Sequence, residues 1–261
     1  MKGRGVRQTH EGPYRRGRVR VPLAFLAAAL SLSGCFADLL VQGPMTTRNF
    51  ACFVLDPEGP PLEIVVQAES ESAYDPVVPA TALEQELVRV SGREPGSIGR
   101  SFLHGPAAPE GGWTQESLDA WAATQVVEEA DLRLHVLWAQ EADLLAPSGA
   151  RLAPGVVVVV HEEVVLGAER LERPVDEVAA WVLMHQVGHA LGQVNDGVPV
   201  QDPDLAKREN PPKHDPSPGS VMHTGWHAAA TMPRNVTEPM YPEAALEDWD
   251  AARAPGGVCG R

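Results

Sequence analysis

The stretch Met-His-Gln-Val-Gly-His-Ala-Leu-Gly, residues 184–192, decides how the rest of the chain can be interpreted. His185 and His189 are four positions apart, which is just over one turn of an α-helix, so both side chains point from the same face. Each could offer a ring nitrogen to the same zinc ion. The spacing therefore predicts two ligands of a metal site. The alternative is a core helix that carries two histidines on its polar face.

The residues around this motif have the composition of a helix. Val178–Met184 is apolar and contains the strong helix formers Ala, Leu and Met. Pro174 suits the entry of a helix, Asp176 is a plausible amino-terminal cap, and Gly192 stands where the helix would have to end. We therefore expect a helix over Arg173–Gly192, which is the active-site helix if the metal interpretation is correct.

Hydrophobic periodicity upstream predicts a mixed α/β sheet with helices packed on it. Five consecutive valines within Gly155–His161 indicate a strand that is buried on both faces. His135, in an alternating strand, is expected on the strand surface and not at a metal. The remaining expected elements are strands at Phe50–Leu55, Leu62–Ala68 and Leu132–Trp138, helices at Thr81–Val90 and Trp113–Ala130, and loops at 91–112 and 141–154.

The first 34 residues have the organisation of an export signal. They contain seven basic residues and one acidic residue, and an apolar run of about twelve residues, Val21–Leu32, follows the basic segment. That run is too short to cross a bilayer as a stable helix, but it fits the core of a secretory signal peptide.

The residues that end this run resemble a bacterial lipobox. Leu32-Ser33-Gly34-Cys35 fits the motif in which cleavage precedes a cysteine that is then acylated. The resemblance implies a signal peptide over 1–34, a lipidated tether over 35–48 and one folded domain over 49–261. It also implies an exported lipoprotein of the bacterial cell envelope, held in the membrane by lipid on Cys35. Because Phe36 and not Asp follows the cysteine, we expect delivery to the outer membrane. The alternative is an ordinary signal peptide with a chance cysteine.

Charge and cysteine content restrict the partners and the compartment. The chain carries a net charge of −14, and the basic first 34 residues leave −20 for the remainder. A body this acidic disfavours nucleic acid as a partner. Once Cys35 is lipidated, Cys52 and Cys259 are the two remaining cysteines, and export would place them in an oxidising compartment. We expect a disulfide between them, the alternative being two unpaired buried thiols.

The histidine motif and a segment downstream resemble the metzincin zinc peptidases, most closely archaemetzincin-like bacterial lipoproteins. Residues 185–192 follow His-Glu-x-x-His-x-x-Gly except at Gln186, and His214 precedes Met222 by eight positions, as in the archaemetzincin pattern. The resemblance covers 175–223 and implies that His214 is the third Zn²⁺ ligand and that Met222 forms the turn beneath the metal. In this chain Asp215 and Ser220 replace two family cysteines, and about twenty residues are inserted before His214.

Other groups could complete the metal site. Asp196 and His223 are the alternatives to His214 as the third ligand, and a catalytic zinc site requires three protein ligands with water in the fourth position. Two histidines alone would not hold the ion.

Gln186 determines how much activity can be expected. In the family a glutamate at this position takes a proton from the attacking water, and an amide cannot do so. Loss of a positioned general base costs about 10²- to 10⁴-fold in rate. The sequence is therefore compatible with three interpretations. The first is a peptidase that acts on peptide or protein substrates, with weak activity or with a base such as Glu162 or Glu163. The second is an inactive zinc-binding pseudo-peptidase, and the third is a lipoprotein without metal.

Overall fold

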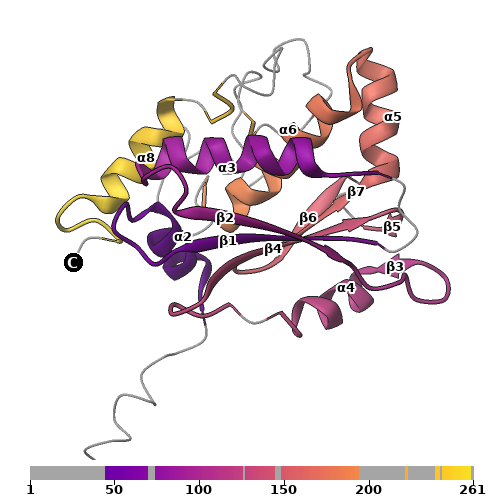
Figure 1. Cartoon of the computed structure of the whole chain (residues 1–261), viewed down its shortest axis with the longest axis horizontal. Coiled ribbons are helices and arrows are strands. Elements are labelled where there is room, and N and C mark those ends of the chain that lie inside the picture. The colour runs from indigo at the N-terminus through magenta and orange to yellow at the C-terminus, as the bar shows by residue number, and fades with distance from the viewer. Residues whose placement is uncertain are drawn as a thin grey trace, which may run out of the picture. The chain divides into compact units, whose positions relative to one another are not determined.

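A five-stranded sheet forms the centre of the structure (Figure 1). The computed structural model describes residues 45–69, 74–125, 127–144, 148–193, 221–222, 239–241 and 243–259. Within these residues the helices are α2 (Thr47–Leu55), α3 (Val77–Ser91), α4 (Gln115–Ala122), α5 (His161–Leu171), α6 (Val175–Ala190) and α8 (Glu243–Arg253). The strands are β1 (Leu62–Ala68), β2 (Ile98–His104), β3 (Trp113–Thr114), β4 (Leu132–Ala139), β5 (Ala142–Asp143), β6 (Gly149–Ala153) and β7 (Val156–Val160).

The strand order in the main sheet is β2-β1-β4-β7-β6. The first four strands are parallel, and β6 runs antiparallel to β7 at one edge. The expected mixed α/β sheet is therefore confirmed. Since parallel strands end at the same edge of a sheet, the helices that follow them start from that edge. α5 does so directly, because it begins at His161 where β7 ends.

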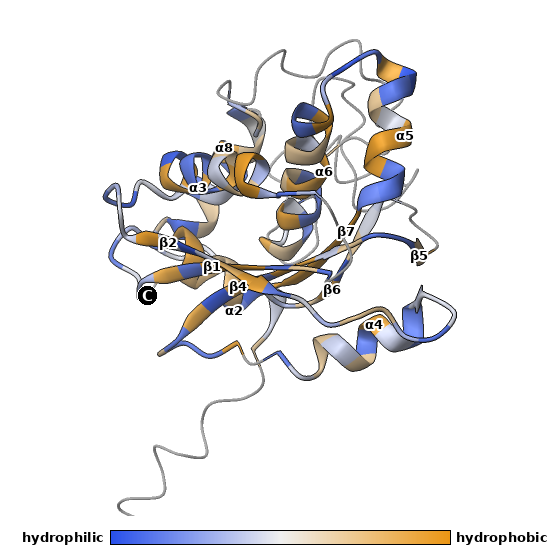
Figure 2. Cartoon of the chain, turned by 45° about the vertical axis from the view of Figure 1, so that its right-hand side comes forward, coloured by the Kyte–Doolittle hydropathy of each residue, from blue (hydrophilic) through white to orange (hydrophobic). Residues whose placement is uncertain are grey.

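Helices cover both faces of the sheet. α3, α6 and α8 lie on one face and α4 lies on the other, as Figures 1 and 2 show. The larger apolar cluster lies beneath α3 and α6, and a smaller cluster that includes Trp121 and Leu137 lies beneath α4. Alternate valines of β7 belong to the two clusters, and each of the five is at most 2% exposed. The prediction that this strand is buried on both faces is confirmed.

The amino-terminal element of the described body is a helix, so the strand expected at Phe50–Leu55 is wrong. α2 begins at Thr47, inside the expected tether, and the Thr46 hydroxyl accepts a hydrogen bond from the Asn49 N–H. The buried positions are spaced as on one face of a helix and do not alternate as in a half-buried strand: Phe50, Ala51, Val54 and Leu55. Short apolar runs do not distinguish a helix from a strand by pattern alone.

Three strands and one helix lie in segments where the sequence predicts no regular structure. β2 falls within the expected loop 91–112, and β5 and β6 fall within the expected loop 141–154. Six of the seven residues of β2 are not buried, so its sequence lacks the apolar pattern of a core strand. α5 also was not expected; it ends at Leu171, and the residue that caps it, Glu172, has a positive φ of 52°.

His135 is buried, with 5% exposure, and not on the surface as its position in an alternating strand suggests. It lies in β4, which is paired on both sides and has helices over both faces. The helix α4 covers the face that a half-buried strand would have presented to water. None of the helices in the described part of the chain is long and apolar enough to cross a membrane.

A disulfide joins the two ends of the folded body. Cys52 in α2 is bonded to Cys259, which follows α8, across 207 positions of sequence. The pairing expected from the cysteine count is therefore present. The guanidinium of Arg253, in α8, donates to the backbone oxygens of Leu55 and Val90, so the carboxyl-terminal helix also holds the ends of α2 and α3.

The double substitution Cys52→Ser, Cys259→Ser should lower the free energy of unfolding by about 2–5 kcal/mol, because the bridge restricts a long loop in the unfolded chain. Urea denaturation of the full-length protein measures the change. Cys35→Ser is the matched control, since it removes a cysteine without removing the bridge, and it should leave the free energy of unfolding unchanged. An equal stability of the double variant and the parent would contradict this account of the disulfide.

Candidate metal centre

The helix that carries the two histidines is buried along most of its length. α6 begins after Pro174 and ends before Gly192, whose φ of 74° lets the chain turn away. Asp176 lies in the first turn and is not the cap expected from the sequence; its carboxylate accepts a hydrogen bond of 2.6 Å from the Tyr74 hydroxyl. Eleven of the sixteen residues are buried: Val178–Met184, Gln186–Gly188 and Ala190. The histidines are only partly buried, so they lie at the border between the core and the surface.

His185 and His189 lie side by side as their spacing predicts. Their ring centres are 4.9 Å apart and the ring planes are nearly perpendicular, at 84°. Two imidazoles bound through nitrogen to one tetrahedral zinc ion, at bond lengths of about 2.0–2.1 Å, would have ring centres about 5 Å apart. The separation in the structure therefore fits two ligands of one ion.

The orientation of the His185 ring is fixed by two neighbours. Its Nδ1 lies 2.7 Å from the backbone oxygen of Val221, and its ring stacks on Trp181 with centres 5.6 Å apart. A carbonyl oxygen can only accept, so Nδ1 carries the proton, and the unprotonated Nε2 is the ring atom that could bind a metal. A hydrogen bond of this kind is the usual support of a metal-binding histidine.

Met222 packs against α6 at Gly188, which lies between the two histidines in the sequence. A Cβ added at Gly188 would overlap the Met222 sulfur, so the absence of a side chain at Gly188 lets the methionine approach the helix backbone. The Gln193 side chain also contacts Gly188: its Oε1 is 2.9 Å from the position that a Cβ at Gly188 would occupy. The structure therefore places Met222 beside the helical turn that contains the two histidines.

Gln186 faces the antiparallel edge strand. It is 5% exposed, and its Cγ lies 3.3 Å from the position that a Cβ at Gly149 in β6 would occupy. Arg151, in the same strand, donates to the backbone oxygen of His189 at 3.4 Å and to the Thr47 hydroxyl at 2.8 Å. Gln186, which the resemblance assigns to the general-base position, thus lies where the histidine helix meets the edge of the sheet.

The predicted third ligand lies outside the described residues. This holds for His214 and for the alternatives Asp196 and His223, and Cys35 also lies outside them. In the ranges that the structure describes, no group of three or more His, Cys, Asp or Glu side chains is arranged to bind a metal. Convergence of a third ligand on the two histidines therefore remains a prediction.

Several contacts of the site could not be found from the sequence. The Val221 oxygen is a backbone atom, so no residue type in the sequence marks its role. Trp181 has the same apolar character as the other residues of a core helix. Glu162 and Glu163, considered as alternative bases, lie in the first turn of α5, where Glu162 is exposed. The nearest signal in the sequence is Gly188, because a glycine inside a helix that has no kink often marks a close approach by another group.

Gly188→Ala should lower the free energy of unfolding by about 1–3 kcal/mol, because the new methyl group and the Met222 side chain need the same space. Chemical denaturation of the full-length protein measures this cost. The matched background is Met222→Ala, in which the same glycine substitution should cost less because the clash is gone. An equal cost in both backgrounds would show that Met222 does not occupy this position.

Comparison of this chain with protein-family models, with curated proteins and with solved structures gave no match. The resemblance of residues 175–223 to the metzincin pattern therefore remains a prediction from the motif. The function has to be inferred from this chain's own residues.

Proposed function

We propose that the protein is a membrane-anchored, zinc-dependent metallopeptidase-like lipoprotein of the cell envelope. One observation carries the proposal: the rings of His185 and His189 are 4.9 Å apart, and the Nδ1 of His185 is engaged by the Val221 oxygen. This arrangement supports a site in which both imidazole rings bind one ion. Met222, packed against Gly188 of the same helical turn, supports the same interpretation.

The two imidazole ligands fit zinc, and a third ligand is needed to complete the site. Imidazole nitrogen is a preferred zinc ligand, and a catalytic site uses three protein ligands. His185 and His189 would hold the ion together with His214, which the motif supplies. When bound, zinc supplies Lewis-acid chemistry: it polarises a peptide carbonyl and lowers the pKa of the attacking water.

Gln186 is expected to orient the reacting groups and not to take part in proton transfer. Gln186 can donate through its amide nitrogen and accept through its oxygen, so it can orient a water molecule or a peptide group beside β6. It has no basic atom with which to take up a proton. Peptide-bond cleavage by this chain is therefore expected to be slow relative to a glutamate-containing site, by about 10²- to 10⁴-fold.

A catalytically inactive pseudo-peptidase is the second candidate function, and Gln186 is the observation that favours it. The amide is nearly isosteric with glutamate, so the metal site can persist while the proton-transfer group is absent. In that case the protein would bind zinc in a structural or binding role at the membrane. The lipobox-like segment that ends at Cys35 supports the membrane anchor in both cases.

Metal analysis of the purified full-length protein tests the shared claim of both candidates. About one zinc ion per chain is expected for a single site, and His185→Ala, His189→Ala and His214→Ala should each remove most of it. His104→Ala is the matched control, because His104 is an exposed histidine of the edge strand β2 and should leave the zinc content unchanged. A parent protein without zinc would contradict both candidates.

Gln186→Glu separates the two candidates. If the parent is an inactive pseudo-peptidase, the variant cleaves a peptide library and the parent does not. If the parent is a slow peptidase, it also cleaves, the variant is about 10²- to 10⁴-fold faster, and His214→Ala abolishes cleavage in both. Absence of cleavage by a zinc-loaded Gln186→Glu variant would contradict the peptidase proposal, because the restored carboxylate would then have no chemistry to support.

A further inference from the structure

Two short segments from beyond α6 contact the same turn of that helix. Between residue 193 and α8 the structure describes residues 221–222 and 239–241. The first segment reaches the turn through the Val221 oxygen, which bonds His185, and through Met222, which packs on Gly188. The second segment reaches the turn through Tyr241, whose hydroxyl donates to the Met184 backbone oxygen at 2.6 Å.

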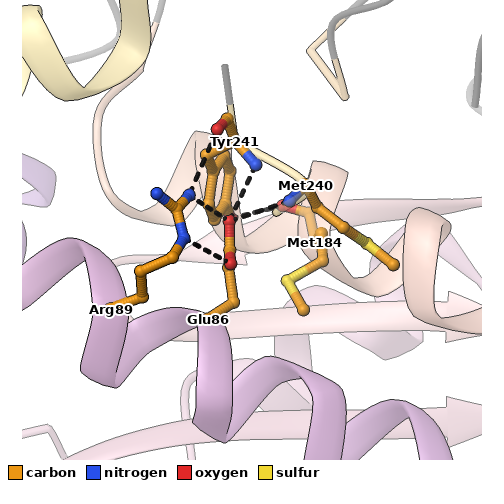
Figure 3. A network of polar contacts seen from close by, with 5 residues as sticks. All are labelled: Glu86, Arg89, Met184, Met240 and Tyr241. Carbon is orange, nitrogen blue, oxygen red and sulfur yellow. Dashed lines mark hydrogen bonds and ion pairs between the residues drawn. The ribbon is translucent and has the colours of Figure 1, made fainter. Parts of the chain in front are cut away.

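The second segment is held by a buried carboxylate of α3 (Figure 3). Glu86 is 6% exposed, and its Oε1 accepts the backbone N–H groups of Met240 at 3.0 Å and Tyr241 at 2.8 Å. Arg89, one turn further along α3, donates to both oxygens of this carboxylate and to the Tyr241 backbone oxygen. Hydrogen bonding to Glu86 raises the pKa of the Arg89 guanidinium, so the guanidinium stays charged. The carboxylate thus fixes the backbone from which the Tyr241 side chain extends.

The Tyr241 ring, like its backbone, is held in place by its neighbours. The residue is 2% exposed, and its ring meets that of Trp249 in α8 with centres 5.0 Å apart at 73°. Burial raises the pKa of the Tyr241 phenol well above its ordinary value, so the hydroxyl remains a donor over the whole physiological range. Its acceptor, the Met184 oxygen, belongs to a residue that is fully buried in α6.

The acceptor is well placed to affect the metal ligand. Met184 directly precedes His185, and in an α-helix its carbonyl also accepts the N–H of residue 188. The peptide group that links Met184 to His185 is therefore held from two directions. Any shift of this peptide would move the His185 Cα, and with it the ring whose Nδ1 is engaged by Val221.

We propose that Tyr241, oriented by Glu86, is a positioning residue for the metal ligand His185. It acts through the Met184–His185 peptide and does not touch the ion. The inference rests on the proposed zinc site. Supporting groups of metal ligands typically change metal affinity by about 10- to 100-fold when they are removed, which sets the size of the expected effect.

The chain offers a matched control at the other end of the same helix. The Tyr74 hydroxyl donates to the Asp176 carboxylate, also at 2.6 Å. Asp176 lies in the first turn of α6, nine positions before His185. Tyr241→Phe and Tyr74→Phe therefore each remove one hydroxyl bonded to α6, but only Tyr241→Phe removes it beside a metal ligand.

Zinc affinity of the two full-length variants, measured by competition with a chromogenic chelator, tests the proposal. Tyr241→Phe should bind zinc about 10-fold or more weakly than the parent, and Tyr74→Phe should bind it within about twofold of the parent. The absorption spectrum of the Co²⁺-loaded protein should change for Tyr241→Phe alone. Denaturation of the metal-free proteins reports the purely structural effect, which both substitutions are expected to share.

Equal zinc affinities and equal Co²⁺ spectra for the two variants would overturn the proposal, because Tyr241 would then be only a stabilising residue. A parent that binds no zinc would instead overturn the proposed function on which the inference rests.

Glu86→Gln provides a second test, since it weakens the hydrogen bonds to the Tyr241 backbone while keeping an acceptor. It should weaken zinc binding in the same direction, and the double variant with Tyr241→Phe should bind no more weakly than Tyr241→Phe alone. Additive losses would show that Glu86 does not act through Tyr241.

Discussion

Burial of α6 on almost every side is the constraint on which the proposed site depends. The helix contacts the strands β6 and β7 on one side and the helices α3 and α5 on others. Turning it about its axis would expose large apolar side chains, each at a cost of about 1.5–3 kcal/mol. The direction in which His185 and His189 point is therefore fixed by the packing of the rest of the helix, and the metal need not impose it.

The packing fixes the helix, and polar groups from distant segments fix the turn that carries the histidines. A backbone oxygen at Val221, a thioether at Met222 and a hydroxyl at Tyr241 contact residues 184–188. The hydroxyl in turn depends on the buried carboxylate of Glu86, which is satisfied by a guanidinium and two backbone N–H groups. Such a carboxylate is tolerated in the interior because each of its hydrogen bonds is made. These contacts restrain the helical turn that carries the two histidines of the proposed site.

The proposed site combines this rigidity with an amide where proton transfer would need a carboxylate. Gln186 is buried against the edge strand β6, so its neutral side chain carries no desolvation cost of a charge. A glutamate there would be partly desolvated, which raises its pKa and makes it a better base. In the proposed site the metal ligands and the residue at the proton-transfer position are different side chains, so metal binding could persist where activity is lost.

The sequence by itself determined the parts that depend on local periodicity. These are the valine strand, the helix of the two histidines with its end at Gly192, the side-by-side placement of His185 and His189, and the mixed α/β sheet. It could not distinguish a helix from a strand at 50–55, nor find the edge strands β2 and β6, because short apolar runs and exposed strands carry little periodic signal. Only the tertiary structure decided which groups support the turn 184–188, since the Val221 oxygen and the Tyr241 hydroxyl come from 36 and 57 positions away in the chain. Periodicity reports which face of an element is apolar, whereas a contact between remote segments depends on how the complete core packs.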